Sequence, residues 1–86
     1  MVRIIDSARK HDISDEDIMW VYYTAHDGIQ LSEEPEKFML FGFDTKGIPL
    51  EVGYFVNEDN EIIIMHAMKL RKSYYKYLFK EGLWLN

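Results

Sequence analysis

The 86-residue chain contains no cysteine, so no disulfide bond can stabilise it. This absence is typical of proteins in a reducing compartment and predicts a cytoplasmic location. The longest apolar run, Ile62–Met65, is far too short to cross a bilayer, and the N-terminus lacks the continuous apolar stretch of a signal peptide. We therefore expect a soluble protein without membrane contact, folded as a single domain over residues 1–86.

Several motifs of enzymes and metal proteins are also missing from the sequence. The chain has no GxxxxGK[ST], GxGxxG or GxSxG pattern, which gives no support to nucleotide-binding or serine-hydrolase functions. Its three histidines, His11, His26 and His66, lie 15 and 40 residues apart without an HxxxH pair. The sequence therefore predicts neither a metal site nor a cofactor.

The composition is that of a folded domain with an uneven charge distribution. Hydrophobic residues make up 48% and aromatic residues 15% of the chain, enough for a packed core. The net charge of −5 argues against broad binding to nucleic acid. However, residues 66–86 hold five bases and one acid, whereas the other 14 acids precede them. Either this basic segment forms a local anion site, or it pairs with the acidic body.

Hydrophobic spacing predicts helices at both ends of the chain. Residues 2–11 have an apolar face and predict a first helix, for which Asp12 is a suitable end because a short polar side chain tolerates a left-handed backbone. Ser14 is the expected cap of a second helix, which ends near residues 26–28. A C-terminal helix is expected from Lys69 or Leu70 to Lys80.

Between the helices, alternation and turn residues predict an antiparallel meander. Strands are expected at residues 37–44, 49–57 and 61–67, with a short edge strand at 28–31. The predicted fold class is thus α+β: two N-terminal helices, an antiparallel sheet of three to four strands and a C-terminal helix.

The expected hairpin registers define a candidate site. If Asn57 pairs with Asn60, then Glu51 lies directly opposite His66. If the preceding turn centres on residues 46–47, Met39 and Phe41 lie on the other face of the sheet. The carboxylate could hold the imidazole for chemistry, or the two residues could simply form a cross-strand ion pair.

Other candidate residues have equally ordinary structural explanations. Lys10 and His11 end the first predicted helix, where cations favour the helix dipole. Tyr75 could stack on a nucleic-acid base, although neighbouring tyrosines at helical spacing are typical core residues. The apolar tail at residues 83–85 could contact a partner, form a homodimer, or pack on the sheet.

Short motifs in this sequence resemble those of a known family. The segment Ala8–Ser14, ARKHDIS, is similar to the KHGVS segment of BrnT-type toxins, which are small ribonucleases related in fold to RelE toxins. The stretches Phe38–Gly42, Gly47–Val52 and Ile62–Lys69 resemble three strands of that family. The chain departs from the family by beginning almost at its first predicted helix. It also has His66 and Met68 where the family has serine and arginine.

The resemblance implies the toxin of a bacterial toxin–antitoxin pair, which cleaves RNA without a metal and is covered by its cognate antitoxin. In such a site, His66 would be the general acid or base, oriented by Glu51. A basic group would bind the scissile phosphate and stabilise charge. Its members would be Lys69, Arg71 and Lys72, with Lys10, His11 and Tyr75 adding substrate contacts. The alternative is a non-catalytic module of the same fold that binds a partner protein.

Overall fold

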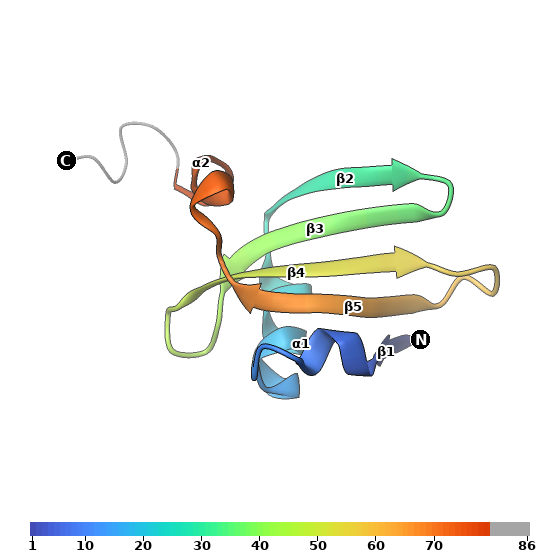
Figure 1. The fold of residues 1–86 in the computed structure, drawn as a ribbon, viewed down its shortest axis with the longest axis horizontal. Helices are drawn as coiled ribbons and strands as arrows, with labels where there is room; N and C mark the ends of the chain where they lie inside the picture. The colour runs from blue at the N-terminus through green and yellow to red at the C-terminus, as the bar shows by residue number, and fades with distance from the viewer. Residues whose placement is uncertain (80–86) are drawn as a thin grey trace.

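The computed structural model describes residues 1–79, which form one sheet with helical segments on both of its faces (Figure 1). The sheet has five strands in the order β1-β5-β4-β3-β2. Strands β2 to β5 are antiparallel neighbours, whereas β1 runs parallel to β5. The elements are β1 (Val2–Ile4), a 3-10 helix η1 (Asp6–Arg9), α1 (Asp15–Thr24), β2 (Asp27–Glu33), β3 (Glu36–Phe43), β4 (Pro49–Val56), β5 (Ile62–Lys69), a 3-10 helix η2 (Lys72–Tyr74) and α2 (Tyr75–Leu78).

The predicted antiparallel meander with two N-terminal helices is wrong, because the sheet is mixed and only α1 is an N-terminal α-helix. Residues expected to begin the first helix form β1, which pairs in register with residues 62–64 of β5. The β-branched residues Val2, Ile4 and Ile5 suit an extended chain, and their strand partner lies 60 residues away, beyond the reach of a local pattern. Only one short 3-10 turn, η1, remains of the predicted helix.

The start of α1 is confirmed. Ser14 caps the helix, its hydroxyl accepting a 3.1 Å hydrogen bond from the Asp17 amide. Asp12 adopts the left-handed conformation expected of it, with φ of 60°. The Asp17 carboxylate extends the cap into a tertiary contact, since it accepts hydrogen bonds from both the amide and the hydroxyl of Thr45.

The two faces of the sheet carry separate apolar clusters. On one face, η1 and α1 cover β4 and β5, burying Ala8, Ile18 and Val21 against Val52 and Ile64. On the opposite face, Met39 and Phe41 of β3 pack with Leu70 and the tyrosines of η2 and α2, and the Phe41 ring stacks on Tyr77 at 5.2 Å. The helical segments therefore enclose the sheet from both sides, and α2 covers only one end of its face (Figure 1).

Both hairpin loops contain five residues instead of the predicted two, and each strand pairing is therefore offset by one residue from the predicted register. Phe43 pairs with Pro49 and Val56 with Ile62, so each pair encloses five residues. In each loop the first side chain, Asp44 or Asn57, accepts hydrogen bonds from two amides that follow it. This side-chain capping favours the longer loops over two-residue turns.

The longer first loop moves β3 by one residue, which exchanges its faces. Met39 pairs with Gly53 and Phe41 with Glu51, so these side chains share the face of Glu51. The predicted placement of Met39 and Phe41 on the other face is therefore wrong. In β5, the second loop shifts the register by one residue, and a bulge at Met65 shifts it by one more. The two shifts together return His66 to the face of Glu51.

The predicted C-terminal helix begins later and is shorter than expected. Lys69 still belongs to β5, and Arg71 is extended, with φ of −77° and ψ of 148°. The Leu70 amide bonds to the Pro49 carbonyl and the Arg71 amide donates to the Glu51 side chain, so the chain stays extended beyond β5. Lys80 and the apolar tail at 83–85 lie outside the described residues. Within residues 1–79, no helix has the length and apolar character needed to cross a membrane.

Candidate functional site

Glu51 is the centre of the candidate site, and its side chain is completely buried. It is carried by β4, where it pairs with Phe41 on one side and Met68 on the other. A buried carboxylate needs compensating donors, because removing its charge from water is unfavourable. The Glu51 oxygens have such donors, since no buried side-chain nitrogen or oxygen in the described residues lacks a hydrogen-bond partner.

Arg71 supplies most of these donors. Its backbone amide and its Nε both lie 3.0 Å from Glu51 Oε1, and its Nη2 lies 2.6 Å from Glu51 Oε2. The side chain nevertheless remains 49% exposed. Because Glu51 engages Nε and Nη2, the Nη1 donors of the guanidinium stay available for an oxygen of a ligand.

The contacts keep Glu51 ionised. Burial raises the pKa of its carboxyl group, but hydrogen bonds from Arg71 and His66 and the charge of Arg71 outweigh burial, so the pKa lies below its usual value. The same hydrogen bond with Glu51 raises the pKa of Arg71. Carboxylate and guanidinium therefore form a permanent ion pair over a broad pH range.

His66 is the third member of the cluster, and its contact with Glu51 confirms the predicted pair. Its Nε2 lies 2.8 Å from Glu51 Oε2. The backbone partner of His66 is Gly53, so the imidazole reaches Glu51 diagonally and not from the directly opposite position. An ionised carboxylate only accepts hydrogen bonds, so the proton must sit on Nε2. In the neutral imidazole, Nδ1 is then the basic nitrogen.

His11 lies beside His66, although the two residues are far apart in sequence. Their ring centroids are 6.0 Å apart and the ring planes are nearly perpendicular. Residues 10–12 follow η1, which contacts β5 and is tied to it by a hydrogen bond from the Ser7 hydroxyl to the Met65 carbonyl. His11 is exposed. Two imidazoles, a half-exposed guanidinium and a buried carboxylate thus converge at one place, which we call the histidine cluster: His11, Glu51, His66 and Arg71.

The other predicted residues lie at different positions around this cluster. Lys10 is exposed next to His11, and Lys72 is exposed next to Arg71, so both flank it. Lys69 pairs with Leu50 and so belongs to the opposite face of the sheet from Glu51. Tyr75 packs edge-on against Phe79 at 5.5 Å and covers the second apolar cluster.

The contact of the Arg71 amide with Glu51 and the contact between His11 and His66 were not predicted from the sequence. Arg71 was expected in the first turn of a helix, where backbone amides lack an acceptor within the helix, and its acceptor, the Glu51 side chain, lies 20 residues away in sequence. The approach of His11 depends on β1 and η1, whose partner strand is remote in sequence. In the described part of the chain, no three His, Asp or Glu side chains are arranged to hold a metal ion.

No protein-family model, curated protein or solved structure matches this chain.

Proposed function

We propose that the histidine cluster is the active site of a metal-independent ribonuclease, the toxin of a toxin–antitoxin pair. The observation that carries this proposal is the pair of imidazoles 6.0 Å apart, one of them bound to a buried carboxylate that also holds a half-exposed arginine. Acid, base and phosphate-binding cation are the groups that phosphodiester transfer requires without a metal. The resemblance of its short motifs to those of BrnT-type toxins supports the same function.

The reaction that fits these groups is attack by a ribose 2′-hydroxyl on the adjacent phosphorus. His66 Nδ1 takes the hydroxyl proton as the new phosphorus–oxygen bond forms, and Glu51 stabilises the imidazolium that results. The bond from phosphorus to the 5′-oxygen breaks, and protonated His11 gives its proton to that oxygen. The products are a 2′,3′-cyclic phosphate and a free 5′-hydroxyl.

Arg71 has the role of charge stabilisation in this mechanism. Its Nη1 donors face no part of Glu51 and can bind a non-bridging phosphate oxygen as charge develops there. Lys10 and Lys72 are exposed and adjacent in sequence to His11 and Arg71, and we assign them to the binding of neighbouring phosphates. We propose that the cognate antitoxin covers this basic region and so blocks access of RNA.

Histidine substitutions test the mechanism directly. With labelled single-stranded RNA in the presence of a chelator, we expect His66→Ala and His11→Ala each to lower kcat/KM by about 10²- to 10⁴-fold. His26→Ala is the matched control, because His26 is exposed in the segment between α1 and β2. Circular dichroism would verify that all three variants fold.

The substrate itself provides a second control. Replacing the ribose at the cleaved position by 2′-deoxyribose removes the nucleophile and should abolish cleavage. Cleavage of the deoxy substrate, or unchanged activity of His66→Ala, would show that this mechanism is wrong.

A second candidate function is binding of a partner protein without RNA cleavage. The open outer edge of β2 favours it, since β2 pairs only with β3 among the described residues and exposes Leu31. Sheet edges of this kind can accept a strand from another protein. A stable complex with the neighbouring gene product, combined with no cleavage of any RNA by the free protein, would favour this second function.

A further inference from the structure

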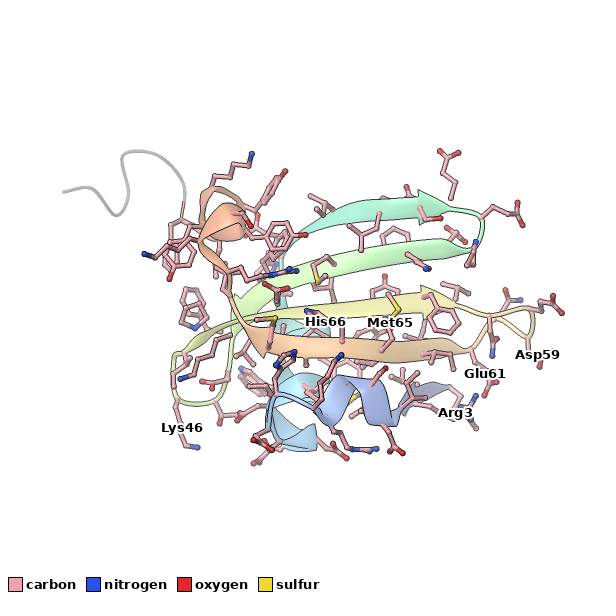
Figure 2. The ribbon with its side chains drawn as sticks, viewed as in Figure 1. Arg3, Lys46, Asp59, Glu61, Met65 and His66 are labelled. Atoms are coloured by element: carbon pink, nitrogen blue, oxygen red, sulfur yellow. The ribbon has the colours of Figure 1, made fainter. Side chains whose placement is uncertain are left out.

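The Ser7 hydroxyl joins the two segments that carry the paired imidazoles. It donates a 2.7 Å hydrogen bond to the backbone carbonyl of Met65, the residue that precedes His66 in β5. Ser7 belongs to η1, which ends two residues before His11. Met65 and His66 lie near the middle of the molecule, where η1 runs alongside β5 (Figure 2). One hydrogen bond therefore connects the backbone next to His66 with the short segment that carries His11.

Met65 is the extra residue of the bulge in β5. The pairing of β5 with β4 skips it, because His66 and Ile64 pair with consecutive residues of β4. Within residues 1–79, the pairing of β5 with β1 extends no further than Ile64. A bulge changes the direction of the side chains that follow it. The Ser7 hydroxyl thus binds the backbone at the point where the direction of the His66 side chain is set.

The segment from Ser7 to His11 is held in one shape by local contacts. Arg9 binds the Asp15 carboxylate through two hydrogen bonds of 3.0 and 2.9 Å, which close the loop between η1 and α1. Within that loop, the Asp12 amide donates a 3.2 Å hydrogen bond to the Arg9 carbonyl. Because these contacts fix the loop internally, a movement of Ser7 relative to β5 also moves His11.

Burial of Ala8 holds η1 on the sheet independently of the Ser7 hydroxyl. The Ala8 side chain is completely buried in the cluster that also contains Ile18 and Ile64. Apolar packing is not directional, whereas a hydrogen bond requires a defined distance and angle. Ala8 therefore keeps η1 docked, and the Ser7 hydroxyl defines where along β5 it docks.

We propose that Ser7 is a positioning residue of the histidine cluster, whose hydroxyl sets the spacing of His11 and His66 for proton transfer. This inference rests on the proposed ribonuclease function, in which the two imidazoles act on one phosphate. Each ring must reach its oxygen within about 2.6–3.2 Å, and a displacement of about 1 Å can reduce the rate by about 10²-fold. The rings are 6.0 Å apart and come from remote segments, so their spacing depends on the contact that joins those segments.

Loss and retention of the hydroxyl test the proposal in the whole chain. Ser7→Ala removes the donor, whereas Ser7→Thr keeps it. The matched control is Thr24→Val, because the exposed Thr24 hydroxyl also donates to a backbone carbonyl, 2.6 Å from the Trp20 oxygen. Thr24 ends α1, and this contact stays within that helix. The control therefore removes an equivalent hydrogen bond without touching the connection between η1 and β5.

Kinetics of single-stranded RNA cleavage separate positioning from stability. For Ser7→Ala, we expect kcat to fall by about 10- to 100-fold while KM stays within about threefold of the wild type, because the displaced imidazoles act in the transition state. For Ser7→Thr and Thr24→Val, we expect kcat within about threefold of the wild type. A hydrogen bond that served stability alone would instead affect Ser7→Ala and Thr24→Val equally.

The spacing of the imidazoles can also be measured without RNA. Rings 6.0 Å apart in an edge-on arrangement bring their protons close enough for a nuclear Overhauser effect between His11 and His66. This effect should be present in the wild type, in Ser7→Thr and in Thr24→Val, and it should be lost in Ser7→Ala.

Three results would overturn the role of Ser7: an unchanged kcat in Ser7→Ala, an equal loss of kcat in Ser7→Thr or Thr24→Val, or a ring-to-ring effect that persists in Ser7→Ala. Absence of cleavage by the wild type would contradict the ribonuclease function instead. The ring-to-ring measurement would then still decide whether the Ser7 hydroxyl sets the spacing of the two histidines.

Discussion

Replacing Glu51 by glutamine tests whether the buried carboxylate holds the candidate site together. The substitution keeps the size of the side chain but removes the charge that Arg71 and His66 bind. One glutamine oxygen can still accept hydrogen bonds, whereas its amide group must face a donor of Arg71 or His66. The change therefore breaks an ion pair without creating a cavity.

The expected loss of stability is about 2 kcal/mol. Removing one partner of a fully buried ion pair costs about 3–5 kcal/mol. Arg71 is 49% exposed, so water can solvate its released guanidinium and reduce that cost. For a domain of this size, about 2 kcal/mol lowers Tm by roughly 8–16 °C. Urea unfolding and calorimetry at pH 7 would measure both quantities, with Glu58→Gln as an exposed control.

The pH dependence of this difference identifies its origin. Because the folded protein lowers the pKa of Glu51, the ionised carboxylate adds stability above its unfolded pKa of about 4.3. That stability is lost as the pH falls through the lower, folded-state pKa. The wild type and Glu51→Gln should therefore converge in acid. A difference below about 0.5 kcal/mol at pH 7, or one that persists unchanged in acid, would show that the Glu51 charge does not stabilise the fold.

Two further substitutions test the packing around the cluster. Phe41→Ala should destabilise the fold by about 3–5 kcal/mol in urea unfolding, because Phe41 is completely buried and stacks on Tyr77; a loss under about 1 kcal/mol would contradict this packing. Gly53→Ala would place a methyl group 3.3 Å from the His66 Cβ, and we expect a loss of about 1 kcal/mol together with weaker RNA cleavage. Unchanged stability and cleavage in Gly53→Ala would show that β5 adjusts freely.

The contact between Glu51 and His66 was predicted from a register that proved inaccurate. The five-residue loop shifts β5 by one position, and the bulge at Met65 shifts it by one more in the same sense. Both residues consequently remain on one face, two positions apart in register. The prediction succeeded because side-chain direction repeats every two residues, so that two single-residue shifts restore it.

The predicted face of β3 is wrong because no bulge in the β3–β4 pair corrects the shift. The Asp44 side chain, by accepting two loop amides, defines the longer connection to β4. Phe41 consequently packs beside Glu51 and beneath α2. A loop length can be estimated from turn residues, but the residue at its centre depends on such side-chain contacts.

Features that depend on neighbouring residues could be predicted from the sequence alone. These are the cap of α1 by Ser14, the left-handed Asp12, and the extended character of the four consecutive strands. Tertiary structure decided the parallel pairing of β1, the amide contact of Arg71 and the approach of His11 to His66. Local contacts act within a few residues of the chain, whereas each of these three joins segments at least 20 residues apart. Their stability comes from burial and pairing that exist only once the sheet has formed.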